Sequence, residues 1–173
     1  AGISEDEVDR IIQARPYLDL ADFFLRTKVS RPVIERLISV GAFDSLHGIS
    51  LDPHSLDPVE SAQSASITRR DLLLQLADLD QATKTTRSRA STGQLSLVAA
   101  IDPASSLVPT GLPEMTSAES VRAELEVLGL DASRHVVDFY SSLLDRLNVV
   151  RSKDLLTTRS QSHVLVAGVK VST

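Results

Sequence analysis

The sequence contains no cysteine and no tryptophan, and aromatic residues make up only 3% of its 173 residues. The absence of cysteine excludes a disulfide framework, a thiolate metal site and a cysteine nucleophile. No apolar run approaches the roughly 20 residues that a membrane-spanning helix needs, and the amino terminus has neither the basic nor the apolar region of a signal peptide. Apolar residues nevertheless make up 42% of the chain, enough to bury a core. We therefore expect a cytoplasmic protein.

The net charge of −5 is unevenly distributed along the chain. Residues 1–60 carry six basic and eleven acidic side chains, and residues 94–173 carry seven and nine. Only residues 61–93 are locally basic, with five basic and three acidic side chains. These cations could follow a DNA phosphate backbone, but without aromatic residues for base stacking a solvated face and a disordered tail explain them slightly better. The five candidates are Arg69, Arg70, Lys84, Arg87 and Arg89.

Hydrophobic periodicity predicts a mainly α-helical fold that begins with a small helical unit over residues 1–48. Ser4 and Glu7 have the spacing of a capping box, which places a helix start at this point. Pro16 ends that helix, because it disfavours helical geometry at the preceding residue. Two further short helices are expected before residue 48. The small core of this unit is predicted to contain Ile12, Phe23, Phe24, Leu37 and Phe43.

Helical and polar stretches alternate beyond this unit. Residues 49–82 are predicted to form a loop and an amphipathic helix that ends at Ala82. Residues 83–113 are predicted to be a mobile linker, because its first eleven residues include a single apolar side chain. Residues 114–148 are predicted to be a helical linker. The valine-rich residues 161–173 predict one β-strand, whose partners must lie beyond Thr173 or in another chain because one strand forms no sheet.

No catalytic constellation is visible in the sequence. The histidines are scattered and none stands at metal-ligand spacing from another. Those at 47 and 54 flank loop prolines and are predicted to be solvated. Glycine motifs that bind phosphates or present a nucleophile are absent. We interpret the chain as non-catalytic, with no metal ligand and no cofactor; the four histidines are His47, His54, His135 and His163.

Four stretches follow one another in the order found in a known protein family. They are Gly2-Ile-Ser with the helix that ends Ile-Ile-Gln-Ala-Arg15, residues 16–46, the sequence Glu126-Val-Leu-Gly-Leu-Asp-Ala-Ser-Arg-His135, and the strand His163 to Val171. Together they resemble the carboxy-terminal part of bacterial DNA polymerase III alpha subunits, with features of the error-prone branch. The resemblance implies a helix-hairpin-helix region, a linker and the start of an OB-fold, within a longer chain.

The resemblance also implies how this segment would act. In a helix-hairpin-helix, backbone N–H groups of the hairpin bind a DNA phosphate, which here points to Gly2, Ile3 and Ser4, although Ser4 stands where the family has a second glycine. The family's catalytic carboxylates lie upstream, so the Mg²⁺ of a parent polymerase would bind there and not on this segment. The implied partners are primer-template DNA, the sliding clamp and other polymerase or mutasome subunits.

A short peptide after the basic stretch resembles the pentapeptide that binds bacterial sliding clamps, usually Gln-Leu-Ser/Asp-Leu-Phe. Such a peptide places its glutamine in a polar notch and its apolar side chains in a pocket. Valine replaces the usual phenylalanine here and buries less area. An ordinary linker explains the same five residues, and their location within the family resemblance is what supports the clamp interpretation. The candidates are Gln94, Leu95, Ser96, Leu97 and Val98.

Two other classes of function compete with this one. A freestanding helical adaptor could bind a protein partner through the helices expected at 65–82 or 117–147. An independent small enzyme has no residue constellation to support it. An open reading frame that continues on both sides of the chain would favour the polymerase segment over the adaptor.

Overall fold

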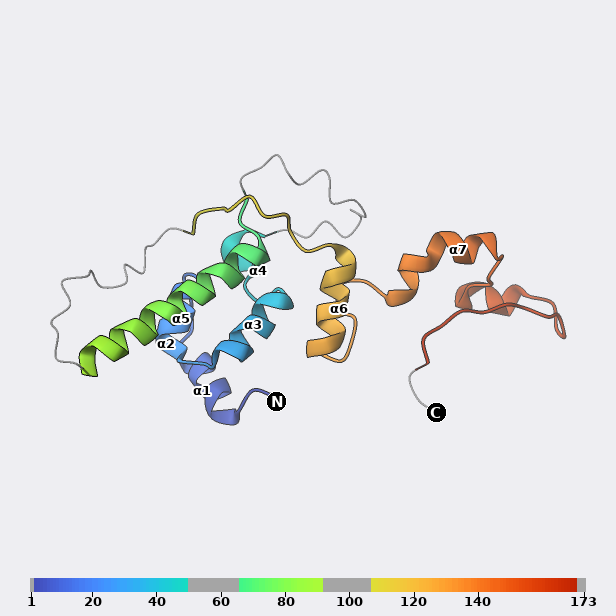
Figure 1. Cartoon of the computed structure of the whole chain (residues 1–173). Coiled ribbons are helices and arrows are strands. Elements are labelled where there is room, and N and C mark those ends of the chain that lie inside the picture. The colour runs from blue at the N-terminus through green and yellow to red at the C-terminus, as the bar shows by residue number, and fades with distance from the viewer. Residues whose placement is uncertain (1, 50–65, 92–106, 171–173) are drawn as a thin grey trace.

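Figure 1 shows a computed structural model of the chain, which describes residues 2–49, 66–91 and 107–170. In these ranges the fold is mainly α-helical, as the periodicity predicts. None of the helices described there combines the length and hydrophobicity that a bilayer crossing requires. The elements are α1 (Glu5–Gln13), α2 (Leu20–Thr27), α3 (Arg31–Ser39), α4 (Asp44–His47), α5 (Arg69–Ser91), α6 (Ser117–Val127), the 3-10 helix η2 (Val136–Tyr140), α7 (Ser141–Arg146) and the 3-10 helix η3 (Ser152–Thr157).

Local side-chain caps set the start of two helices. The Glu7 N–H donates to Ser4 Oγ at 3.3 Å, and the Ser4 N–H donates to Glu7 Oε2 at 3.0 Å, which is the expected capping box of α1. Thr116 and Glu119 make the same reciprocal pair at the start of α6. Each cap satisfies backbone donors that the helix itself leaves unpaired. The sequence therefore predicted both starts correctly.

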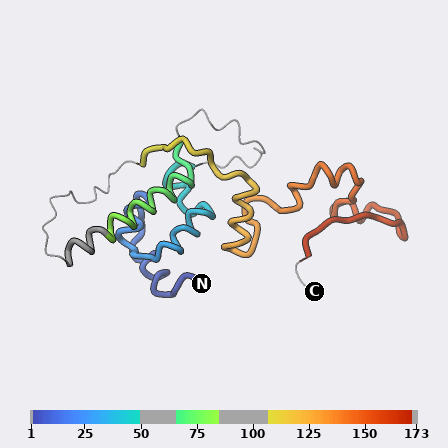
Figure 2. Tube along the Cα trace, in the orientation of Figure 1, coloured from blue at the N-terminus to red at the C-terminus, as the bar shows by residue number. Residues whose placement is uncertain are grey.

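Helix α5 completes the hydrophobic core of the N-terminal helices. It packs against α2 and α3 (Figure 2), and both Leu72 and Leu76 are fully buried. Of the residues predicted for the core, Ile12 is wrong, because its side chain is 55% exposed. The buried cluster consists of Leu20, Phe23, Val29, Val33, Ile34, Ile38, Phe43, Leu72 and Leu76, with Phe24 and Leu37 partly buried against it.

Three of the few aromatic side chains pack in a row inside this core. The rings of Tyr17 and Phe23 meet edge to face with 4.9 Å between centroids, and those of Phe23 and Phe43 do the same at 5.0 Å. Edge-to-face pairs add about 0.5–1.5 kcal/mol each to the effect of area burial. The row joins the turn after α1, helix α2 and the turn before α4, so it fixes the first 48 residues as one packed unit.

Helix α5 is longer than the sequence predicts. Its apolar stripe stops at Leu79, which led to an expected end at Ala82, yet the helix continues to Ser91. The extension contains lysine, arginine and alanine, which are good helix formers even without a buried face. The expected linker over 83–113 is therefore helical up to Ser91. Its residues 92–106 lie outside the described ranges.

The chain after α6 is built differently. No residue is buried in the described range 128–170, which extends away from the helical core in Figure 1. Residues 163–170 are extended but form no strand; the Val150 N–H donates to the Leu165 carbonyl oxygen at 2.9 Å. The predicted strand is thus not present in the described residues. The physical reason is that a β-strand needs a paired neighbour, and one segment alone forms no sheet.

Candidate nucleic-acid interface

The predicted hairpin contact, residues 2–4, leads directly into α1. The carboxylate of Glu7 accepts hydrogen bonds from three donors around this helix start. Glu7 Oε2 accepts the Ser4 N–H and the Ser4 hydroxyl, both at 3.0 Å, and Glu7 Oε1 accepts the Ser30 N–H at 3.0 Å. Glu7 therefore joins the start of α1 to the residue that precedes α3.

These hydrogen bonds keep Glu7 ionised. The N–H donors of Ser4 and Ser30 lower the pKa of its carboxyl to about 2, with smaller contributions from the same residues' side-chain interactions. Glu5 and Asp6 accompany it in the first turn of α1. The helix start thus carries three carboxylates at the point where the sequence predicted a phosphate contact by Gly2, Ile3 and Ser4.

Arg69 was predicted to contact DNA, but the structure places it in the interior. Its side chain is 4% exposed, and Nη2 lies 2.6 Å from Asp44 Oδ2. Nε donates to Asp44 Oδ1 at 3.0 Å, and Nη1 donates to the Ser39 carbonyl oxygen at 3.0 Å. A buried guanidinium that is paired with a carboxylate cannot reach a phosphate backbone. The predicted contact of Arg69 with DNA is therefore wrong. Arg69 instead fastens α5 to the turn between α3 and α4.

Gly41 makes room for this arginine. Its φ of +80° lies in the left-handed region that favours glycine, and a Cβ atom at this position would lie 2.1 Å from Arg69 Nη2. Gly41 follows Val40, the C-cap of α3, where a residue in the left-handed conformation ends the helix. The close approach of Arg69 gives the same glycine a second role that only the tertiary structure reveals.

A second buried group, the carboxylate of Asp71, ties a distant segment to the start of α5. Asp71 Oδ2 accepts the Thr68 N–H at 2.9 Å, while Oδ1 accepts the Thr110 N–H at 3.2 Å and the Thr110 hydroxyl. Burial alone would raise the pKa of Asp71, but the hydrogen bonds from Thr110 and Thr68 outweigh it and lower the pKa. Glu114 adds a further bond, because its Oε2 accepts the Arg69 N–H at 2.8 Å. Residues 107–116 are thereby held against α5.

Sequence reasoning missed this cluster of Arg69, Asp71, Thr110 and Glu114. One local signal was available, since Thr68 and Asp71 have the spacing of a capping box and do exchange backbone N–H bonds. The partners at 110 and 114 follow 39 and 45 residues later. No local pattern marks contacts of that separation.

Two of the other predicted cations, Arg70 and Lys84, form ion pairs at the surface. Arg70 Nη2 lies 3.1 Å from Glu119 Oε2, which links α5 to α6. Lys84 Nζ lies 2.7 Å from Asp80 Oδ2, and its side chain is 72% exposed. Asp80 also accepts Arg31 Nη1 at 3.3 Å, and the two cations, Lys84 first, lower the pKa of Asp80. Exposed pairs of this kind contribute little to stability, so these cations remain accessible to an anionic partner.

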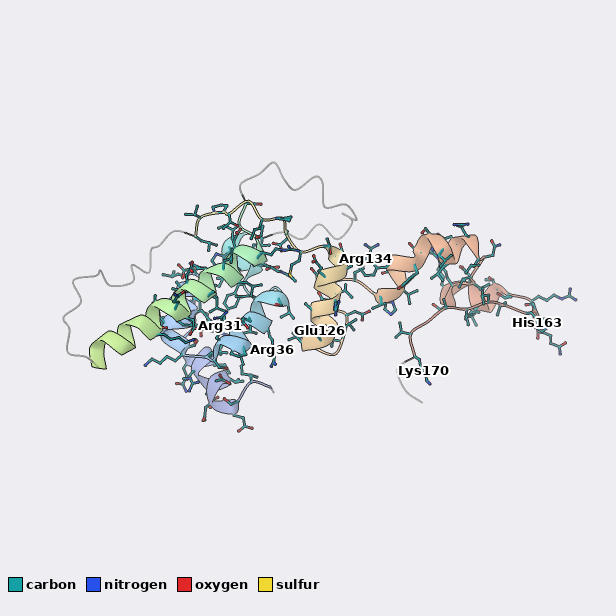
Figure 3. The ribbon with its side chains drawn as sticks, in the orientation of Figure 1. Arg31, Arg36, Glu126, Arg134, His163 and Lys170 are labelled. Atoms are coloured by element: carbon teal, nitrogen blue, oxygen red, sulfur yellow. The ribbon has the colours of Figure 1, made fainter. Side chains whose placement is uncertain are left out.

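The remaining predicted contacts lie partly or wholly outside the described residues. Arg87 and Arg89 belong to the helical backbone of α5, and their side chains are outside the description. The clamp-like peptide, residues 94–98, lies outside the described residues. Figure 3 shows that two further basic or titratable residues, His163 and Lys170, lie on the exposed carboxy-terminal segment, far from α5.

His47 is not the solvated residue that its loop position suggested. Its side chain is half-buried, and Nε2 accepts the Leu20 N–H at 3.2 Å, at the start of α2. Burial lowers the pKa of His47, against the opposing influence of the Asp19 and Asp44 carboxylates. The neutral ring therefore serves as the acceptor for a backbone donor at a helix start.

This contact predicts a pH dependence of stability. With a lowered folded pKa, the unfolded chain binds more protons, so the His47 contribution is complete above about pH 6.5 and is lost as the pH falls through the folded pKa. We expect the free energy of unfolding, measured with urea between pH 7.5 and 5.5, to fall in the parent. In the His47→Gln variant the slope should be flatter, whereas His163→Gln should leave it unchanged. Equal slopes in the parent and His47→Gln would contradict the assignment.

Metal binding has no support in the described ranges. Among residues 2–49, 66–91 and 107–170, no three histidine, aspartate or glutamate side chains come together as a metal site would require. The four histidines are also far apart in the sequence, at 47, 54, 135 and 163. The polar chemistry of the described chain is therefore that of caps, ion pairs and exposed cations.

Comparison with known proteins shows similarity to a helix-hairpin-helix motif family and to bacterial DNA polymerases. The model of the "Helix-hairpin-helix motif" family matches residues 1–50, which contain α1 to α4. The error-prone DNA polymerase of Sinorhizobium medicae is 27% identical over 169 residues, or 96% of this chain and 13% of the relative. The DNA polymerase III subunit alpha of Vibrio cholerae is 27% identical over 181 residues, or 99% of this chain and 14% of the relative. The chain is homologous to these bacterial DNA polymerases.

A third polymerase relative covers a similar share of the chain. The error-prone DNA polymerase of Nocardia farcinica is 28% identical over 170 residues, again 96% of this chain and 13% of the relative. No solved structure matches the chain. The polymerase homology thus covers almost all of this chain but only a small share of each polymerase.

Within this polymerase homologue the helix-hairpin-helix match coincides with the packed N-terminal unit. The aromatic row and the bonds of Glu7 lie inside residues 1–50, whereas α5 contributes from outside the matched region. The polymerase-related unit is therefore a folded helical body to which α5 and residues 107–116 are fastened by Arg69 and Asp71.

Proposed function

We propose that this chain acts as a non-catalytic segment of a bacterial DNA polymerase of the DNA polymerase III alpha or error-prone type. In this role it binds duplex DNA and helps to tether the sliding clamp. The observation that carries the proposal is the alignment of 96–99% of the chain with polymerases of both names. Because the chain spans only 13–14% of these relatives, nucleotidyl transfer and its Mg²⁺ are assigned to other parts of the parent polymerase.

The distal half of α5 is the part of this chain that best suits a DNA phosphate backbone. From Lys84 to Ser91 the helix has three basic residues and no acidic one, Lys84, Arg87 and Arg89. The apolar stripe that anchors α5 in the core ends at Leu79, so this half extends beyond the packed body (Figure 1). A basic helix end of this kind offers phosphate contacts without base recognition.

The proposed contact predicts a salt-dependent loss of DNA binding. Replacing Lys84, Arg87 and Arg89 by Gln should weaken binding to primer-template duplex at low salt. It should also reduce the slope of log K against log salt by roughly 0.9 for each phosphate contact that is lost. Fluorescence anisotropy at salt concentrations between about 50 and about 200 mM would measure the affinity and its salt dependence.

A matched variant separates contact from net charge. Replacing Arg15, Arg122 and Arg146 by Gln removes the same charge from exposed positions after α1, on α6 and on α7. This control should keep most of the parent's slope. If both triple variants lose the same affinity and slope, α5 is not the contact and the chain responds to charge alone.

The clamp contact is assigned to the peptide Gln94 to Val98, on the strength of its sequence. The flanking described residues support this placement. Helix α5 ends at Ser91, and the chain returns at Leu107, which packs against the core, and at Thr110, which bonds Asp71. The peptide therefore stands between helix α5 and a segment held against the core, so clamp binding would hold the helical body close to the clamp.

One observation favours the adaptor as a second candidate. The chain after α6 exposes many large apolar side chains, with Leu156 at 97% exposure as the extreme case. Such a surface suits a protein contact. Binding to purified clamp and to primer-template DNA, measured side by side on the whole chain, distinguishes the two candidates. An adaptor would bind neither, whereas the proposed polymerase segment binds both.

A further inference from the structure

The start of α1 resembles an anion site that is already filled. Three donors converge there: the Ser4 N–H, the Ser4 hydroxyl and the Ser30 N–H. They come from two segments, the residue before α1 and the residue before α3. All three donate to the carboxylate of Glu7, with distances of 3.0 Å. The Ser4 N–H belongs to the hairpin that the sequence assigned to a phosphate, and Glu7 accepts this donor in place of a phosphate oxygen.

The Glu7 carboxylate is difficult to displace from these donors. A phosphate that took its place would have to break the bonds to both serines and leave the Glu7 charge without partners. It would also approach Glu5 and Asp6, which stand in the same turn. Like charges at this range repel. The pKa of about 2 shows that the carboxylate stays charged at any pH at which DNA is bound.

We propose that Glu7 is an internal anion that occupies the hairpin of this helix-hairpin-helix unit and excludes a DNA phosphate from Ser4 and Ser30. The hairpin then serves to join α1 to α3 and makes no contact with DNA. This inference is independent of whether α5 binds DNA.

Two isosteric variants of the whole chain test the proposal. Glu7→Gln removes the charge but keeps an acceptor that supports a capping box. Glu5→Gln removes the same charge from the same turn and serves as the matched control, because it is Glu7 that accepts the hydrogen bonds of both serines. We expect Glu7→Gln to raise the affinity for primer-template duplex several-fold more than Glu5→Gln. Circular dichroism and the urea midpoint would check that both variants remain folded.

Amide resonances locate the contact directly. In the parent chain the Ser4 and Ser30 amide signals should stay in place during titration with the duplex, and in Glu7→Gln they should shift as DNA binds. Shifts of both amides in the parent would overturn the proposal, whether or not any variant folds. Equal affinities of Glu7→Gln and Glu5→Gln, or no DNA binding by Glu7→Gln, would also overturn it. Failure of the parent to bind DNA would count against the α5 contact alone.

Discussion

Replacing Asp44 by Ala should destabilise the helical body by roughly 3 kcal/mol, the size of effect seen when one partner of a buried ion pair is removed. The Arg69 guanidinium, 4% exposed, would lose its carboxylate partner while it remained enclosed by the turn after α3. For a chain of this length the melting temperature should fall by about 6–12 °C. Urea unfolding, followed by circular dichroism at constant pH, would measure the change.

An exposed ion pair provides the control for this prediction. Arg122 and Glu126 lie 3.2 Å apart on α6, with 82% and 66% of their side chains exposed. Glu126→Ala should change the free energy of unfolding by less than about 0.5 kcal/mol. If Asp44→Ala is no more harmful than Glu126→Ala, Arg69 is not fastened through Asp44 and becomes available to DNA again.

Replacing Gln94 and Leu97 together by Ala should weaken binding to the bacterial sliding clamp by more than about tenfold, because a polar anchor and an apolar anchor are lost at once. Val98→Phe should strengthen binding by several-fold, since the larger ring buries more apolar area, worth on the order of 1 kcal/mol. Calorimetry of the whole chain with purified clamp measures both changes.

The peptide itself offers a control. Ser96 stands at a position where the related peptides tolerate Ser or Asp, so Ser96→Ala should leave the affinity almost unchanged. If the double Ala variant binds like the parent, or if Val98→Phe has no effect, residues 94–98 are only a linker. A loss in all variants, Ser96→Ala included, would point to misfolding and is checked by the melting temperature.

Local chemistry accounts for what the sequence predicted well. The capping boxes at Ser4 and Thr116 involve residues three positions apart, so each is visible in a short window. The mainly α-helical class follows in the same way from apolar spacing along single helices. The family resemblance, which extends over the whole chain, was also available from the order of its motifs and agrees with the polymerase relatives.

The errors share a cause. Arg69 was assigned to a basic surface because it belongs to a cluster of cations in the sequence, but the cluster is divided by the fold. Leu72 and Leu76 turn one side of α5 toward the core, and Arg69 follows that side to meet Asp44. His47 was judged from neighbouring prolines, yet its ring accepts a hydrogen bond from a residue 27 positions away. Ile12 keeps helical spacing but faces solvent.

The sequence by itself determined where α1 and α6 start, which segments are polar, and which protein family the chain resembles, because each of these depends on neighbours along the chain. Only the tertiary structure decided which charges are usable. Burial pairs Arg69 with Asp44 and Asp71 with Thr110, and chain reversal brings the Ser30 N–H to Glu7. A side chain's charge is written in the sequence, whereas its availability depends on the solvent and the partners that folding places around it.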